Sequence, residues 1–249
     1  MITSLAGGRV LAEKHGATPP KVVALHGWAR DGGDFAMIVS GLDAVSIHLP
    51  GFGPAAPPDE VWGTDDYADL VAEAIAAFAP VVIVAHSFGG RVAVQLAAKR
   101  PELVSGLVLT GVPLVRLAPA SQPPLAFRFA RWANARGLVS DRRMDALRNA
   151  RGSADYRAAH GVMRGIMVRA VNENYDEALA ALSINPVPKR FVWGADDTAA
   201  PTEAGRVAAE RAGAPFRTID GCAHLLTGDL ELAVREELLA VLAETEGAV

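Results

Sequence analysis

The stretch VVIVAHSFGGRVAVQLAAKR, from Val81 to Arg100, places one serine between two different residue patterns. The residues before Ser87 are apolar and mostly β-branched, which is typical of a buried strand, whereas those after it are alanine-rich with helical spacing. The stretch therefore predicts a strand that turns directly into a helix at Ser87. Such a turn needs small residues on both sides, and Ala85 and Gly89 stand two positions away. A serine that only caps the helix would fit the same pattern.

Similar apolar runs alternate with helical patterns along most of the chain. Near-continuous apolar strands separated by helices indicate a parallel sheet that is covered on both faces. Gly7 and Gly8, between two short extended runs, predict a hairpin at the N-terminus. The predicted strands are 21–27, 44–51, 81–87, 104–113, 189–197 and 215–224, and the predicted helices are 65–78, 89–100, 202–212 and 230–244.

The segment 114–187 breaks this alternation. Near its start lies a proline-rich stretch, APASQPPLAF, and helical periodicity follows as far as the next predicted strand. We therefore expect an α/β core formed by residues 1–113 and 188–249, with a helical cap inserted at 114–187.

Composition narrows the class of protein. The chain has 249 residues, 51% of them hydrophobic, and a net charge of −4, which gives no reason to expect a nucleic-acid partner. The single cysteine, Cys222, excludes an internal disulfide. Neither a Cys pair nor an H-E-x-x-H motif is present, so we expect no metal site. The longest apolar run, Ile75 to Ala85, is too short to span a bilayer, and the N-terminus lacks a signal-peptide pattern. We expect a cytoplasmic protein.

Three loops carry the residues that a nucleophilic serine requires. Serine needs a base within hydrogen-bond reach and an acid that orients this base. His224 follows the last predicted strand, and Asp196 and Asp197 follow the strand before it. Functional groups of parallel sheets collect beyond the C-terminal ends of the strands, so these side chains are expected to meet Ser87 there. The chain order Ser, Asp, His is the one expected on an α/β sheet.

A developing oxyanion would need backbone N–H donors next to the serine. The motif LHGW brings Gly27 close to the predicted reaction centre, and the amide of Trp28 would be the first donor. The amide of Phe88, at the start of the helix after Ser87, would be the second.

With these motifs the chain resembles α/β-hydrolase fold enzymes of the lid-bearing esterase, lipase and C–C hydrolase branch. The resemblance rests on LHGW, LPGFG, AHSFGGRVAVQLAAKRPELV, WGADDTAAP and GCAHLL, in this order. It implies a mostly parallel eight-stranded sheet flanked by helices, with Ser87 as nucleophile, His224 as base and Asp197 as acid. Asp197 rather than Asp196 fits the G-x-x-D-x-x-x-P pattern of the family. Ala85 departs mildly from that family, which usually has glycine there.

The resemblance also implies a function. We expect a serine carboxylesterase that acts on a small-molecule ester through an acyl-enzyme and needs no cofactor, and the number of subunits stays open. A thioesterase, a C–C bond hydrolase, a lactonase and a cofactor-free perhydrolase would use the same triad. A non-catalytic binding module with this fold is a further alternative, although such proteins typically lose a triad residue.

Candidate substrate-binding residues come from the first loop and the insertion. His26 is one of them, although its ring is better suited to order the oxyanion loop by hydrogen bonds. Phe127, Trp132 and Met163 are candidates for the pocket wall, although aromatic and Met residues at helical spacing also form buried helix faces. Ten arginines lie between Arg128 and Arg169, and one of them is a candidate for binding a substrate carboxylate.

Overall fold

The structure, a computed structural model, describes residues 1–17, 19–117, 125–149 and 154–247. Its centre is an eight-stranded sheet with the strand order β1-β2-β4-β3-β5-β6-β7-β8. Only the pairs β1–β2 and β2–β4 are antiparallel, so the predicted mostly parallel sheet is confirmed. The strands are β1 (Ile2–Leu5), β2 (Val10–His15), β3 (Val22–Leu25), β4 (Ala44–His48), β5 (Val81–His86), β6 (Val104–Thr110), β7 (Lys189–Gly194) and β8 (Phe216–Ile219).

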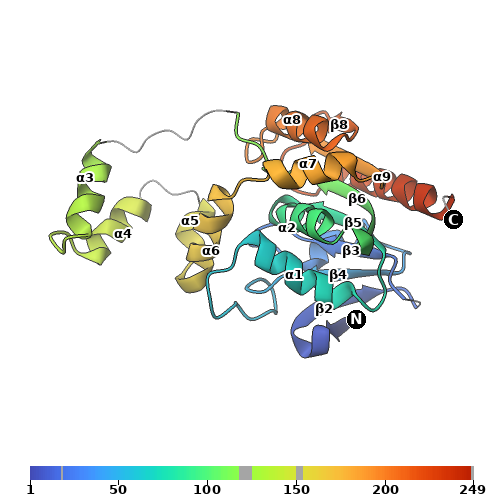
Figure 1. The fold of residues 1–249 in the computed structure, drawn as a ribbon, viewed down its shortest axis with the longest axis horizontal. Helices are drawn as coiled ribbons and strands as arrows, with labels where there is room; N and C mark the ends of the chain where they lie inside the picture. Colours follow the sequence, from blue (N-terminus) through green and yellow to red (C-terminus); the bar gives the residue numbers. More distant parts are fainter. Residues whose placement is uncertain (18, 118–124, 150–153, 248–249) are drawn as a thin grey trace.

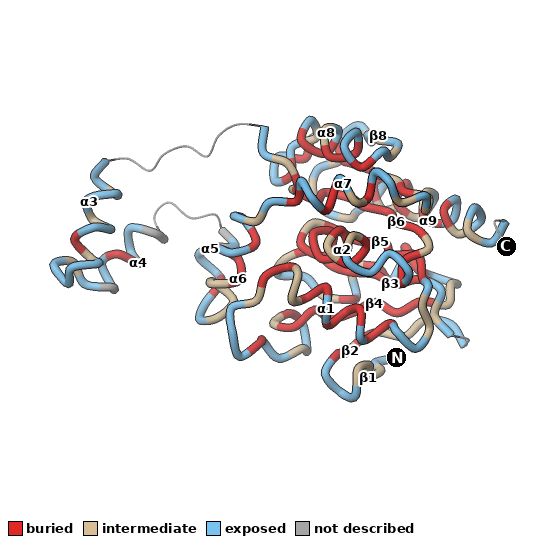
Figure 2. Tube along the Cα trace, viewed as in Figure 1, coloured by how far each residue is buried: buried red, intermediate tan, exposed pale blue. Residues whose placement is uncertain are grey.

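Helices cover both faces of this sheet (Figure 1). On one face lie α1 (Thr64–Ile75), α2 (Ser87–Lys99), α7 (Asp176–Ile184) and α8 (Thr202–Ala212). On the other lie α9 (Gly228–Gly247) and the short helix η2 (Gly32–Phe35). Side chains along a strand alternate between the two faces: Ile83 of β5 packs under the first layer, and Val82 and Val84 pack under α9. The buried residues in Figure 2 accordingly follow the strands and the inner sides of the helices.

The observed strands and helices agree with the predicted ones, apart from differences in where some of them begin or end. The glycine hairpin forms between β1 and β2, with Gly7 at φ +65° and Gly8 at φ +99°. The strand predicted for 215–224 is shorter, because β8 ends at Ile219 and Gly221 takes φ +69°. The chain beyond β8 therefore turns instead of continuing the sheet.

The described part of the inserted segment is mainly helical. It contains α3 (Leu125–Asn134), α4 (Asp141–Asn149), α5 (Ala154–Ala158), α6 (Gly161–Asn172) and α7. Most of the predicted proline-rich stretch, 118–124, lies outside the described residues.

The last of these helices differs from the expected organisation. Leu179 and Leu182 of α7 are completely buried in the core cluster that also contains the inner sides of α1 and α2. This helix therefore forms part of the layer over the sheet, and we propose that the cap itself consists of α3 to α6. Among the described helices, none has the length and apolarity needed to cross a bilayer.

Candidate active site

Ser87 lies at a strained turn between β5 and α2. Its φ is +49°, a region that residues other than glycine rarely adopt. The turn passes so close to β3 that a Cβ on Gly89 would lie 2.3 Å from the carbonyl oxygen of Leu25. The amide of Gly89 also donates a hydrogen bond to the carbonyl of His26, at 2.9 Å. This contact connects the serine turn to the loop that follows β3.

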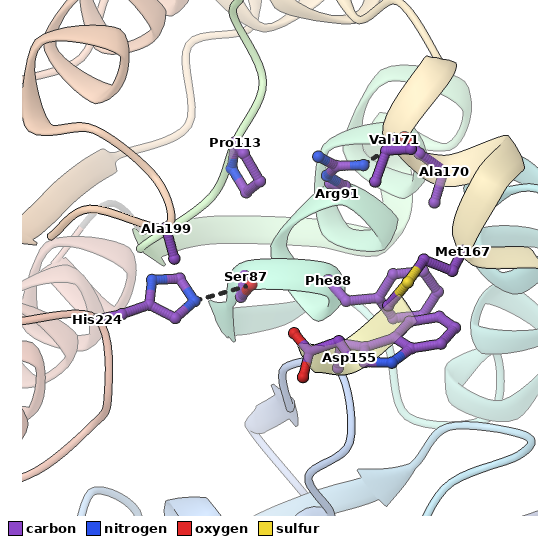
Figure 3. Close-up of a pocket in the computed structure, with 11 residues that line it drawn as sticks. Ser87, Phe88, Arg91, Pro113, Asp155, Met167, Ala170, Val171, Ala199 and His224 are labelled. Atoms are coloured by element: carbon purple, nitrogen blue, oxygen red, sulfur yellow. Dashed lines mark hydrogen bonds between the residues drawn. The ribbon is translucent and has the colours of Figure 1, made fainter. Parts of the chain in front are cut away.

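His224 and Asp197 meet Ser87 at the C-terminal edge of the sheet. The Nε2 atom of His224 lies 3.2 Å from the Oγ atom of Ser87 (Figure 3). The Nδ1 atom of His224 lies 2.8 Å from Oδ2 of Asp197. An ionised carboxylate only accepts hydrogen bonds, so Nδ1 carries the proton and Nε2 is free to accept one from the serine. Three predicted residues from distant parts of the chain are thus joined in one hydrogen-bonded row.

The loop after β7 holds the Asp197 carboxylate in place. Its Oδ1 atom accepts hydrogen bonds from the amides of Ala199 and Ala200, at 2.9 and 2.8 Å. Asp197 is buried, whereas the neighbouring Asp196 is exposed. Gly194 is required here because a Cβ would lie 2.3 Å from the carbonyl oxygen of Ala223, in the loop that carries His224.

The loop after β3 approaches Ser87 through Gly27. A Cβ on Gly27 would lie 2.8 Å from His86 Nδ1 and 3.4 Å from Ser87 Cβ. The ring of His26 fixes this loop, because its Nε2 accepts a hydrogen bond from the Leu49 amide and its Nδ1 donates one to the Gly27 carbonyl. His26 is completely buried and does not line the cavity beside Ser87, which favours its role in ordering this loop over direct contact with a substrate.

The side chains that flank this loop are aromatic. Trp28, after Gly27, and Phe88, after Ser87, pack edge to face with ring centroids 5.3 Å apart. Both residues line the cavity next to the serine.

His86 supports the histidine of the row from behind. Its Nε2 donates a hydrogen bond to the backbone carbonyl of His224, at 2.9 Å, and the two ring centroids lie 4.8 Å apart. Burial lowers the pKa of His86 to about 4, so its ring is neutral near pH 7. Gly111 completes the packing, since a Cβ there would lie 3.1 Å from both histidine rings.

A cavity of about 350 Å³ opens beside Ser87 and His224. Its wall is mainly apolar and is built jointly by the core and by helices α5 and α6 (Figure 3). Besides Ser87 and His224, it is lined by Trp28, Phe88, Arg91, Pro113, Asp155, Met167, Ala170, Val171 and Ala199. Within the described ranges, no three His, Cys, Asp or Glu side chains are grouped to hold a metal ion.

The predicted pocket residues of the insertion lie elsewhere. Met163 of α6 packs directly over Gly51, where a Cβ would overlap its sulfur atom, and Met167, one helical turn further on, takes the place in the cavity wall. Phe127 and Trp132 are on α3 and do not line this cavity, and Trp132 stacks with Phe129. Sequence reasoning also missed Arg91, although its spacing of four residues from Ser87 puts both on one side of α2.

Comparison with known proteins agrees with this fold and site. Residues 22–236 match the sequence model described as the Alpha/beta hydrolase family, and the chain belongs to this family. Esterase Rv0045c from Mycobacterium tuberculosis is 30% identical over 116 residues, which cover 45% of this chain and 39% of that relative.

Two solved structures share the fold. One is the meta-cleavage product hydrolase from Pseudomonas fluorescens IP01, with a TM-score of 0.66 at 18% identity, covering 98% of this chain and 97% of the other. The other is the thioesterase domain from the curacin biosynthetic pathway, with a TM-score of 0.66 at 19% identity, covering 96% and 98%. At these identities the likeness establishes the fold alone, so the reaction has to be argued from the site.

Proposed function

We propose that this protein is a serine hydrolase that cleaves a small carboxylic ester through an acyl-enzyme. The observation that carries the proposal is the row of Ser87 Oγ, His224 Nε2 and Asp197 Oδ2, with distances of 3.2 and 2.8 Å, beside an accessible cavity. A non-catalytic protein would have no need for a serine held at a positive φ against a correctly oriented imidazole.

The reaction follows from the positions of these groups. Ser87 Oγ attacks the ester carbonyl while His224 Nε2 takes its proton, and Asp197 stabilises the imidazolium. The amides of Trp28 and Phe88 donate hydrogen bonds to the resulting oxyanion. The proton on His224 then passes to the leaving alcohol, and His224 activates the water that hydrolyses the acyl-enzyme.

The size and lining of the cavity support a small substrate. A volume of about 350 Å³ is at the lower end of the range for small-molecule sites, and its wall offers mostly carbon atoms. Esterase Rv0045c, a partial relative, is named for the same type of reaction.

Labelling with a serine-directed phosphonate tests the proposal. We expect one equivalent of label on Ser87 and none in Ser87→Ala, and we expect Ser87→Ala to lower ester turnover by at least about a thousandfold. Circular dichroism and a melting curve serve as the control for folding. Absence of label in folded wild-type protein would favour a binding module and refute the proposal.

A substrate panel distinguishes esters from other bonds that the same triad can cleave. Matched oxoesters, thioesters, lactones and a vinylogous diketone are compared by kcat/KM. We expect the oxoesters to give the highest values, and a higher value for any other class would replace the ester in the proposal.

A further inference from the structure

Arg91 is a buried cation in the wall of the candidate active site. It lies four residues after Ser87 on α2, which corresponds to about 6 Å along the helix axis. Only 9% of the residue is exposed, yet it lines both the cavity beside Ser87 and a second cavity of about 440 Å³. Arg91, Pro113 and Val171 are shared by the two walls, so the guanidinium stands where the cavities adjoin.

The hydrogen-bonding capacity of this guanidinium is incompletely used. Its Nη1 donates to the carbonyl of Ala170 near the C-terminal end of α6, and its carbon atom lies 5.7 Å from the centre of the Tyr175 ring. Its Nε is buried and has no partner in the described part of the chain. A guanidinium has five N–H donors, so that of Arg91 can donate further hydrogen bonds to a bound ligand.

The charge of Arg91 is not balanced by a contacting carboxylate. It forms no ion pair within 4.0 Å with any side chain that the structure describes. The Tyr175 hydroxyl and Glu173 both act favourably on the charge of Arg91. Both oxygens of Glu173 already accept hydrogen bonds, however, from the Thr64 amide and hydroxyl and from the Tyr175 hydroxyl. A buried charge without a close counter-ion is costly, and an anion bound beside it would remove that cost.

The carboxylate of Asp155, also in the cavity wall, determines on which side of the cavity a substrate anion would bind. Asp155 of α5 is exposed and lies on the other side of the cavity from Arg91 (Figure 3). A negatively charged substrate group would therefore be repelled from the Asp155 side and attracted toward Arg91. The second cavity beyond Arg91 is lined by Arg116 and Glu173, whose opposite charges offset each other.

We propose that Arg91 binds a carboxylate of the substrate, so that the preferred esters carry a carboxylate a few carbon atoms from the scissile carbonyl. This inference rests on the proposed ester hydrolysis and defines its substrate class. The guanidinium provides a fork of N–H donors that matches a carboxylate, and this interaction is made in the core on α2 rather than by an arginine of the cap.

A purely structural role makes a different prediction. If Arg91 only connects α2 to the end of α6, its removal lowers stability and affects charged and neutral substrates equally. If it binds a carboxylate, its removal changes the ratio between them. The ratio is therefore the decisive quantity.

The experiment compares esters of equal length and shape. The first series contains monomethyl esters of straight dicarboxylic acids with four to eight carbons, each beside the ester in which a carboxamide replaces the carboxylate. A second series places the carboxylate in the alcohol part, as acetate esters of ω-hydroxy acids beside their amides. We expect wild-type protein to prefer the carboxylate by at least about tenfold in kcat/KM in one of the series, which identifies the part of the substrate that carries it.

The variant Arg91→Met is expected to bring the preferred ratio close to one. Arg217→Met is the matched control, since Arg217 is an exposed arginine on β8 that pairs with Glu236 and Glu237, and it should leave the ratio unchanged. A wild-type ratio near one in both series, or an equal ratio in wild type and folded Arg91→Met, would overturn the inference.

If Arg91→Met fails to fold, a wild-type ratio near one in both series still overturns the inference. Phosphonate labelling of Ser87 distinguishes failure of this inference from failure of the proposed function. Labelled protein without a carboxylate preference would contradict only this inference. Unlabelled protein would contradict the proposed ester hydrolysis as well.

Discussion

Ser87 combines a strained backbone with a serine side chain that has to reach His224. A positive φ at a residue other than glycine costs of order 1–3 kcal/mol, and the surrounding turn has to supply this energy. Gly89 is the neighbour that makes the turn possible, because the backbone of β3 occupies the space of a side chain there.

We expect Gly89→Ala to destabilise the protein by about 3 kcal/mol and to lower ester turnover. The added methyl group would overlap the carbonyl oxygens of Leu25 and His26, at 2.3 and 2.6 Å. Urea unfolding measures the effect, with Gly247→Ala as the control, since nothing lies within 4 Å of a Cβ at that position. Equal stability of both variants would contradict the close approach.

The adjacent residues Asp196 and Asp197 differ in burial: Asp196 is exposed and Asp197 is buried. Asp197→Asn is expected to lower kcat by about 10³–10⁴, because an amide would no longer hold His224 in the tautomer that accepts the serine proton. Asp196→Asn is the matched control, and we expect it to stay within about threefold of wild type because Asp196 is exposed. Steady-state kinetics on one ester measures both. A larger loss in Asp196→Asn would reverse the assignment.

At the scale of elements, the end of α6 is attached to the start of α1. Arg169 of α6 pairs with Asp65, and Glu173, just after α6, accepts hydrogen bonds from the Thr64 amide and hydroxyl. A carboxylate at a helix N-terminus also interacts favourably with the helix dipole. These contacts hold the cavity-lining helix α6 against the core.

We expect Glu173→Gln to lower the free energy of unfolding by about 1–3 kcal/mol, because three donors from Thr64 and Tyr175 lose a charged acceptor. Glu60→Gln, a change at an exposed loop position before α1, should have an effect below about 0.5 kcal/mol. Chemical denaturation compares the two variants. A loss in Glu173→Gln no larger than in the control would show that the attachment does not contribute to stability.

At the scale of the whole molecule, folding buries two neutral histidines, His26 and His86, next to the candidate active site. Burial lowers the pKa values of His26 and His86 to about 4, against 6.5 for an accessible histidine. Between these values the unfolded chain binds more protons than the folded one, so stability is lost as the pH falls from 6.5 toward 4.

Urea unfolding at several pH values from 4.5 to 7.5 is the measurement. Each histidine is expected to contribute a slope of up to about 1.4 kcal/mol per pH unit in that range. His86→Gln should reduce the slope of wild type, while His160→Gln, a change at an exposed position, should leave it unchanged. Identical slopes in the three proteins would show that His86 is not held neutral by the fold.

Most of the architecture could be predicted from the sequence. Buried strands such as β5 and amphipathic helices such as α2 have local patterns, and strand ends bearing Ser87, Asp197 and His224 must converge at one edge of a parallel sheet. The G-x-x-D-x-x-x-P pattern also selected the aspartate that contacts His224. The geometry explains the pattern, because Gly194 is the residue that lets the His224 loop approach.

The pocket wall was predictable only in part. The apolar side of α6 contains both Met163 and Met167, and the rotation of this helix against the core decides which of them faces the cavity. That rotation depends on contacts with α1 and with the loop after β4, which are far away in the sequence. The position of α7 in the core layer likewise depends on its packing against α2 and α8.

The sequence by itself determined the fold and the identity of the three residues in the hydrogen-bonded row, because short-range patterns and chain order encode the fold and the resemblance to the family separates Asp197 from Asp196. Only the tertiary structure decided which side chains surround that row, and it replaced a cap arginine by Arg91 of the core as the candidate for carboxylate binding. The physical reason is that burial and an unmet hydrogen-bonding capacity arise from packing between distant segments, which no local pattern records.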